Sequence, residues 1–82
     1  MDRVVTISHK QPQKAMITWL STHVGALIAS RMFTTEGSGW VLHYASLIRI
    51  QPADQYVLHD HRIEFDDHVP EDLITQFVLT WS

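Results

Sequence analysis

The spacing of hydrophobic and polar positions differs between the first two predicted elements of the chain. Residues 3–9 (RVVTISH) alternate with a period of two, which predicts a β-strand. After Pro12, Met16 and Leu20 recur at helical spacing, which predicts a helix that begins at the proline. We expect Gly25 to end this helix, because glycine accepts the left-handed conformation that is common at helix C-termini.

The middle of the chain is rich in β-branched and aromatic residues and is divided by two turn sequences. The first, EGSG, predicts a hairpin in which residues 27–35 pair with residues 40–50. The second, QPADQ, predicts another turn, followed by a strand over residues 55–65. Because the connections are short, the three strands should form an antiparallel meander.

The last segment, PEDLITQFVLTWS, combines helix and strand signals. Pro70 suits a helix start, and Glu71 and Asp72 interact favourably with the helix dipole at that end. One helical face would carry an apolar stripe made of Leu73, Ile74, Phe77, Val78 and Trp81. QFVLTW also has the composition of a strand, so a fifth strand is the alternative.

These elements follow the order β-α-β-β-β-α and predict an α+β fold. We expect one small domain over residues 1–82, with an antiparallel sheet of about four strands and helices on one of its faces. A chain of 82 residues has no room for a second domain. Its hydrophobic content of 45% is ordinary for a globular domain.

The chain contains no cysteine, which excludes disulfides, thiol catalysis and thiolate metal sites. Small secreted domains usually depend on disulfides, so we expect a cytoplasmic protein. The N-terminal sequence MDRVVTISHK has too short an apolar run for a signal peptide. No apolar segment approaches the roughly 20 residues of a membrane span, so membrane contact is not expected.

Charge is distributed unevenly along the chain. Residues 1–49 contain five Lys or Arg and two Asp or Glu, a net charge of +3. Residues 50–82 contain one Arg and seven Asp or Glu, a net charge of −6. Such an asymmetry indicates an electrostatic partner surface. The six basic residues are too dispersed for a nucleic-acid footprint, so direct nucleic-acid binding is not favoured.

The stretch HDHRIEFDDH, residues 59–68, contains three histidines and four carboxylates. Along a strand, His59 and His61 would share one face, as zinc and copper sites require. His68, or an aspartate beside it, could supply a third ligand at the end of the strand. A histidine-based metal-binding protein or metalloenzyme that uses His59, His61 and His68 is therefore an alternative function.

The interpretation that we favour gives these histidines a structural role. If residues 51–54 form a four-residue turn, the strand register places Ser46 opposite His59 and Tyr44 opposite His61. The helices would cover that face, and buried histidines are normally neutral rings bonded to hydroxyl or backbone groups. We therefore predict no bound metal and no other cofactor.

Residues 60–72 contain six carboxylates and one arginine, and we expect them to form an exposed acidic surface. Clustered charge of one sign selects partners of the opposite sign. The predicted function is a non-enzymatic binding or regulatory module, an inhibitor or adaptor, that contacts a basic protein. The predicted partner-binding residues are Asp60, Glu64, Asp66, Asp67, Glu71 and Asp72.

No catalytic residues are predicted, because the chain has no local nucleophile motif and its GSG sequence lacks the lysine of a phosphate loop. A nucleic-acid or ribosome-associated module fits the outline of a sheet with two helices, although phosphate binding needs concentrated positive charge. A homo-oligomer is also compatible with the sequence. We expect the penultimate residue, Trp81, to pack in the core, because the apolar stripe would otherwise be too narrow.

Overall fold

The described part of the chain begins with a strand and a helix, continues with six strands and ends with a second helix. The structure is a computed structural model that describes residues 3–50 and 55–82. Within these residues the elements are β1 (Val4–Ile7), α1 (Gln13–His23), β2 (Leu27–Ser30), β3 (Thr34–Gly37), β4 (Trp40–His43), β5 (Ser46–Ile50), β6 (Gln55–His59), β7 (His61–Phe65) and α2 (Glu71–Trp81).

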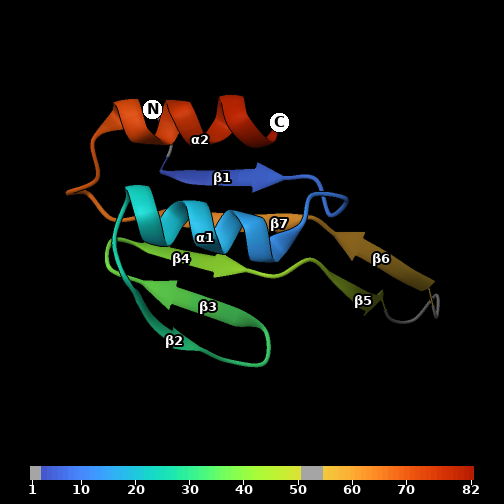
Figure 1. The fold of residues 1–82 in the computed structure, drawn as a ribbon. Coiled ribbons are helices and arrows are strands. Elements are labelled where there is room, and N and C mark those ends of the chain that lie inside the picture. The colour runs from blue at the N-terminus through green and yellow to red at the C-terminus, as the bar shows by residue number, and fades with distance from the viewer. Residues whose placement is uncertain (1–2, 51–54) are drawn as a thin grey trace.

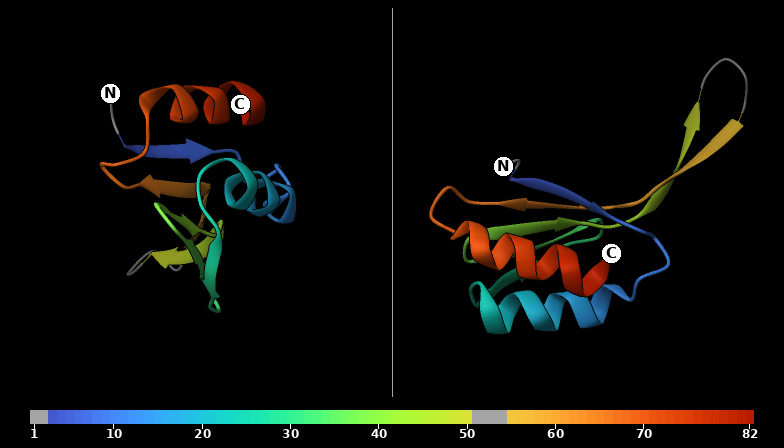
Figure 2. Two further views of the ribbon diagram at one scale, coloured as in Figure 1. Left: turned by 60° about the vertical axis from the view of Figure 1, so that its left-hand side comes forward. Right: turned by 90° about the horizontal axis from the view of Figure 1, so that it is seen from above.

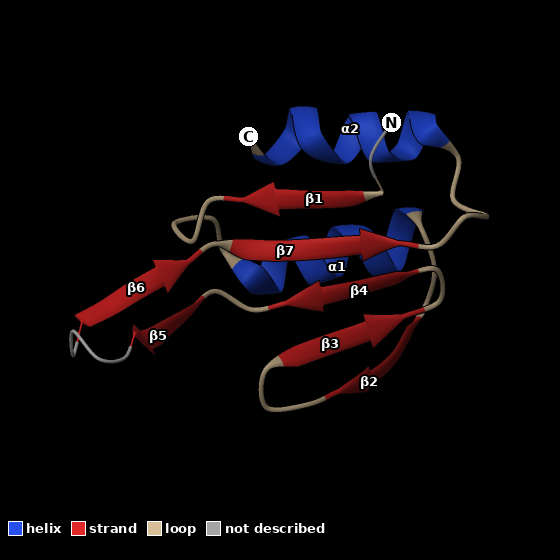
Figure 3. Cartoon of the chain, turned by 180° about the vertical axis from the view of Figure 1, so that it is seen from behind, coloured by secondary structure: helices blue, strands red, loops and turns tan. Residues whose placement is uncertain are grey.

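In the described part of the chain, five strands form one antiparallel sheet in the order β1-β7-β4-β3-β2. β5 and β6 form a separate two-stranded sheet that projects from one end of the molecule (Figure 1). Both helices lie on the same face of the larger sheet (Figure 2), and the opposite face carries no helix (Figure 3). The predicted α+β fold is confirmed, with more and shorter strands than expected.

The segment predicted as one strand over residues 27–35 contains two strands. β2 and β3 pair with each other through a tight turn, in which the Arg31 N–H donates to the Thr34 carbonyl at 2.7 Å. β3 then pairs with β4, which confirms the predicted hairpin turn. The prediction that the first part of the segment pairs with β4 is wrong. The chain reverses within SRMF, a sequence with neither glycine nor proline to signal the turn.

Residues 40–50 and 55–65 are antiparallel neighbours, which confirms that prediction. Each segment is divided in two, so that β4 pairs with β7 while β5 pairs with β6. The divisions fall at residues 44–45 and at Asp60, which lie outside the strands. The β5–β6 pair therefore leaves the main sheet as a separate ribbon.

The β4–β7 and β5–β6 strand pairs have the same register. Ser46 lies opposite His59 in the ribbon, and His43 lies opposite Arg62 in the main sheet. Both pairings follow from the predicted four-residue connection. That connection, residues 51–54, lies outside the described residues.

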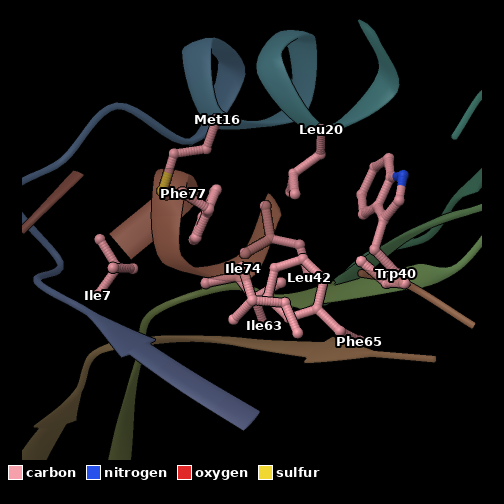
Figure 4. Close-up of a cluster of buried hydrophobic side chains, with 10 residues drawn as sticks. Ile7, Met16, Leu20, Trp40, Leu42, Ile63, Phe65, Ile74 and Phe77 are labelled. Atoms are coloured by element: carbon pink, nitrogen blue, oxygen red, sulfur yellow. The ribbon is translucent and has the colours of Figure 1, made fainter. Parts of the chain in front are cut away.

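The core lies between the main sheet and the two helices (Figure 4). Met16 and Leu20 of α1 are fully buried, as is Phe77 of α2. Both apolar stripes predicted from helical spacing therefore face the sheet. The strands contribute alternate residues to the same cluster, namely Ile7, Trp40, Leu42, Ile63 and Phe65.

The last segment is the helix α2, so the alternative of a fifth strand is wrong. Pro70 precedes it with extended backbone angles, and its carbonyl accepts the Leu73 N–H at 3.1 Å. Pro12 occupies the same position before α1, one residue earlier than predicted for both prolines. Trp81 is partly buried against the core, as expected. Burial of the apolar stripe outweighs the strand propensity of the individual residues.

The end of α1 fits closely onto the β3–β4 turn. The Trp40 Nε1–H donates to the Gly25 carbonyl at 2.7 Å, and a Cβ on Gly37 would lie 2.1 Å from the Trp40 ring. A Cβ on Gly25 would lie 1.9 Å from the Ser38 carbonyl oxygen, so this position needs glycine for close approach. The predicted left-handed conformation of Gly25 is wrong. Among the described glycines it occurs at Gly39, with φ of 89° in the turn itself.

The two helices are short. Each has 11 residues, which correspond to a length of about 16 Å. Within the described residues, neither helix combines the length and apolar character needed to cross a membrane. The helices also cover only part of a molecule whose longest extent is 42 Å.

Candidate functional site

Four of the predicted partner-binding carboxylates gather where β7 ends and α2 begins. Asp66 and Asp67 lie in the connecting turn, while Glu71 and Asp72 belong to the first turn of α2. All four residues are exposed. Figure 1 shows this connection at the end of the molecule opposite the β5–β6 ribbon.

Two glutamates on the helix-free face of the sheet extend this group. Val41 of β4 lies opposite Glu36 of β3 on one side and opposite Glu64 of β7 on the other. Neighbouring strands are about 4.8 Å apart, so the backbones of the two glutamates are about 10 Å apart across β4. We call the whole set the acidic end; it consists of Glu36, Glu64, Asp66, Asp67, Glu71 and Asp72.

An open depression of about 430 Å³ lies on the sheet at the acidic end. Three acidic residues, Glu36, Glu64 and Asp66, contribute to its lining. Its apolar lining residues are Ile28, Trp40, Val41 and Phe65. The depression therefore combines carboxylate groups with apolar surface.

Hydrogen bonds hold the turn after β7 in place. The Asp66 N–H donates to the Gly39 carbonyl at 2.9 Å, which joins this turn to the β3–β4 turn. The Arg3 Nη1–H group donates to the carbonyls of Asp66 and Val69 at 2.9 and 2.6 Å. Arg3 Nε lies 3.8 Å from the carboxylate of Asp67, whose side chain is 97% exposed. Arg3 therefore clamps the turn through its backbone and leaves the Asp67 carboxylate accessible.

Glu64 has two weakly bound neighbours on the helix-free face. Its Oε1 atom lies 3.5 Å from Arg62 Nη2 and 3.5 Å from His43 Nε2. The His43 Nε2 atom has no hydrogen-bond partner, so its 3.5 Å approach to Glu64 is a close contact and not a formed hydrogen bond. An exposed ion pair such as that between Arg62 and Glu64 contributes roughly 0–1 kcal/mol. Glu64 is therefore held weakly by these neighbours.

Asp60 is the predicted partner-binding residue that lies apart from the others. It precedes β7, whereas Asp66 follows it, and the six residue-to-residue steps between them span about 20 Å of extended chain. The Asp60 Oδ1 atom accepts hydrogen bonds from the His9 backbone N–H and from His9 Nδ1, each at 2.9 Å. These bonds, the backbone one first, lower the pKa of Asp60 below its ordinary value. Asp60 thus connects the loop after β1 to the start of β7.

His61 has the buried, structural position that the sequence predicts. It is 4% exposed, and its Nδ1 atom accepts the Ala45 N–H at 3.0 Å. The ring proton therefore resides on Nε2, which donates to the Gln11 carbonyl at 3.2 Å. Of the two kinds of partner expected, hydroxyl and backbone, the backbone supplies both partners of His61, and the Tyr44 hydroxyl contacts Thr35 instead.

The other two histidines of the proposed metal site lie beyond the two ends of β7. His59 is exposed on the projecting ribbon, so the expectation that it is buried is wrong. His68 is exposed in the turn at the acidic end. The structure does not bring His59, His61 and His68 together. Within residues 3–50 and 55–82, no three His, Asp or Glu side chains are grouped in a way that could hold a metal ion.

Glu36 is the residue that the sequence interpretation missed. It lies in the basic first half of the chain, and the predicted strand ended at residue 35. The turn sequence EGSG could have placed Glu36. A tight turn pairs Gly37 with Trp40, and the next pair outward is then Glu36 with Val41.

Comparison of the chain with protein-family models, with curated proteins and with solved structures gives no match. The site must therefore be interpreted from its own geometry and charge.

Proposed function

We propose that this protein is a non-enzymatic binding module, of the inhibitor or adaptor kind, that contacts a basic protein partner through its acidic end. The observation that carries the proposal is the open depression in which acidic residues border apolar ones. Exposed carboxylates alone are an ordinary solvated surface. A depression that adds apolar walls suits a side chain with both an apolar and a cationic part.

Lysine and arginine side chains have this composition. Their methylene stems pack on apolar surface while the charged head stays near water and carboxylates. Ile28 and Val41 would contact the stem, and Glu36 and Glu64 would accept hydrogen bonds from the head. Arginine fits best, because its planar guanidinium binds carboxylates in a bidentate manner.

The rest of the acidic end would attract such a partner before contact. Asp67, Glu71 and Asp72 are exposed in the turn after β7 and in the first turn of α2, and Arg3 Nε lies 3.8 Å from the Asp67 carboxylate. Opposite charge increases association rates, and the effect weakens as salt screens exposed charges beyond about 8–10 Å. The cytoplasm, inferred from the lack of cysteine, is the proposed location of this encounter.

The test begins with identification of the partner. Affinity capture from cell lysate with the intact chain, followed by mass spectrometry, should recover a protein with a basic surface. Association rates are then measured by surface plasmon resonance at low and at physiological salt. The proposal expects a rate that falls as salt increases.

A pair of matched variants assigns the effect to the acidic end. The variant Glu36→Gln with Asp67→Asn removes two negative charges there, and we expect association to slow about tenfold. The control, Thr18→Lys with Thr22→Lys, changes the net charge equally on exposed positions of α1. The control should retain association within about twofold. Equal slowing by both variants would mean that net charge, and not the acidic end, governs binding.

A further inference from the structure

The β5–β6 ribbon, which we call the arm, is the least supported part of the molecule. Its two strands pair only with each other, and no helix covers them in Figures 1 and 2. A two-stranded hairpin alone is marginally stable in water, and stable sheets usually need a third strand or a covering layer. The arm therefore has both unpaired strand edges and uncovered faces.

The arm and the turn at its base expose an unusual amount of apolar surface. The turn belongs to this surface because the Phe33 carbonyl accepts the Tyr44 N–H at 3.0 Å, just before β5. The exposed fractions are 83% for Met32, 67% for Phe33, 65% for Leu47, 64% for Tyr56 and 43% for Leu58. With about 200 Å² for a large side chain, these fractions amount to roughly 640 Å².

That area is slightly above the largest apolar patch on a typical monomer, which covers about 300–600 Å² and is often functional. One partner in a standard protein interface contributes about 800 Å². The arm surface therefore approaches the area that a stable dimer needs from each subunit.

The charge of the arm favours a second copy of the same chain. A two-fold interface brings identical residues near one another, so charged residues would meet like charges. The strand sequences SLIRI and QYVLH contain one charged residue, Arg49. The acidic end lies at the other end of β7, well beyond the distance at which salt screens charge, so two chains of net charge −3 could meet here with little repulsion.

We propose that two copies of the chain associate through their arms, with Leu47, Tyr56 and Leu58 at the centre of the interface. Leu47 lies opposite Leu58, and strand alternation places Tyr56 on the same face. Packing of two arms covers this face in each subunit. It leaves both acidic ends free at the outer ends of the dimer, so the inference is independent of the proposed function.

Sedimentation velocity of the intact chain from micromolar to millimolar concentration tests the proposal. We expect the mass to rise from 9.5 kDa toward twice that value as concentration increases. The variant Leu47→Lys with Leu58→Glu should stay at the mass of one chain. Its opposite charges face each other across the ribbon, which preserves the hairpin while it makes the face polar.

The matched control is Thr75→Glu with Leu79→Lys on α2, where Leu79 is 76% exposed. It introduces the same two charges, four residues apart on a helix, and should dimerise like the unaltered chain. A chain that stays at 9.5 kDa at millimolar concentration would overturn the proposal. So would an arm variant that still dimerises.

Nuclear magnetic resonance distinguishes the arm from other contacts. Amide signals of Met32, Leu47, Tyr56 and Leu58 should shift with concentration, while those of the acidic end should not. Concentration-dependent shifts confined to the acidic end would mean that a different surface mediates dimerisation, and would also overturn the proposal.

Discussion

The two halves of one long hairpin have opposite environments in this protein. Ile63 of β7 is fully buried, whereas Val57 of β6 is 39% exposed, although alternation along the segment assigns both to the same face. The register of the two strand pairs is continuous, so pairing is not the difference. The difference is the helical layer. A helix of about 16 Å covers roughly five strand residues at about 3.3 Å each, which is the length of one strand pair and not of both.

Strand alternation thus decides which face a side chain takes, and the covering layer decides whether that face is buried. His61 and His59 show the consequence. His61 lies under the helices and bonds to two backbone groups, while His59 lies beyond them and is exposed. An interpretation based on alternation alone treats these two histidines as equivalent.

The largest expected effect comes from truncation of the same face in each half. Ile63→Ala should lower the free energy of unfolding by about 3 kcal/mol, because it opens a cavity in a fully packed core. Val57→Ala should cost less than about 1 kcal/mol, because the side chain is already partly in water. Urea denaturation at a concentration below any self-association measures both. Equal losses would show that the arm has its own core.

A smaller effect is expected from the two histidines. His61→Leu would leave the Ala45 N–H and the Gln11 carbonyl without partners inside the protein. We expect a loss of about 2 kcal/mol, since each unsatisfied buried group costs about 1–3 kcal/mol and part of that is recovered by apolar packing. His59→Leu should change the free energy of unfolding by less than about 0.5 kcal/mol. A larger loss for His59→Leu than for His61→Leu would contradict the structure.

The smallest effect concerns Asp60, at the junction of the two halves. Its folded pKa is lowered by the hydrogen bonds from His9, so its stabilising contribution is present above its unfolded pKa of about 3.9. That contribution is lost as pH falls through the lower folded value. Asp60→Asn should therefore be less stable than the unaltered chain at pH 6, and the gap should narrow below about pH 4. Thermal melts over this pH range measure the stability difference between the two chains. A difference that does not change with pH would mean that the ionised Asp60 carboxylate does not stabilise the fold.

Much of the fold follows from local rules in the sequence. The stripes through Met16, Leu20 and Phe77 predict the helices, and a four-residue turn predicts the register of the hairpin. The turn at SRMF was not predictable from turn residues, because the segment has no glycine, proline, asparagine or aspartate and its one serine is the last residue of β2. The division of the hairpin depends on helix length relative to strand length, which is a tertiary property.

The candidate site divides in the same way. Asp66, Asp67, Glu71 and Asp72 are neighbours in sequence, so their proximity in the fold needs little more than a short turn. Glu36 joins them through strand pairing between distant segments. Asp60 lies apart from them because the whole of β7 separates it from Asp66. The length of an extended strand follows directly from the number of its residues, so this separation could be predicted.

Amide hydrogen exchange, followed by mass spectrometry at low micromolar concentration, tests the contrast between the two halves most directly. The account predicts that amides of β4 and β7 exchange at least about a hundredfold more slowly than those of β5 and β6, because only the first pair lies under the helices. Protection of the arm equal to that of β4 and β7 in the monomer would contradict it. The arm would then be an integral part of the core, and its apolar surface would need no second copy.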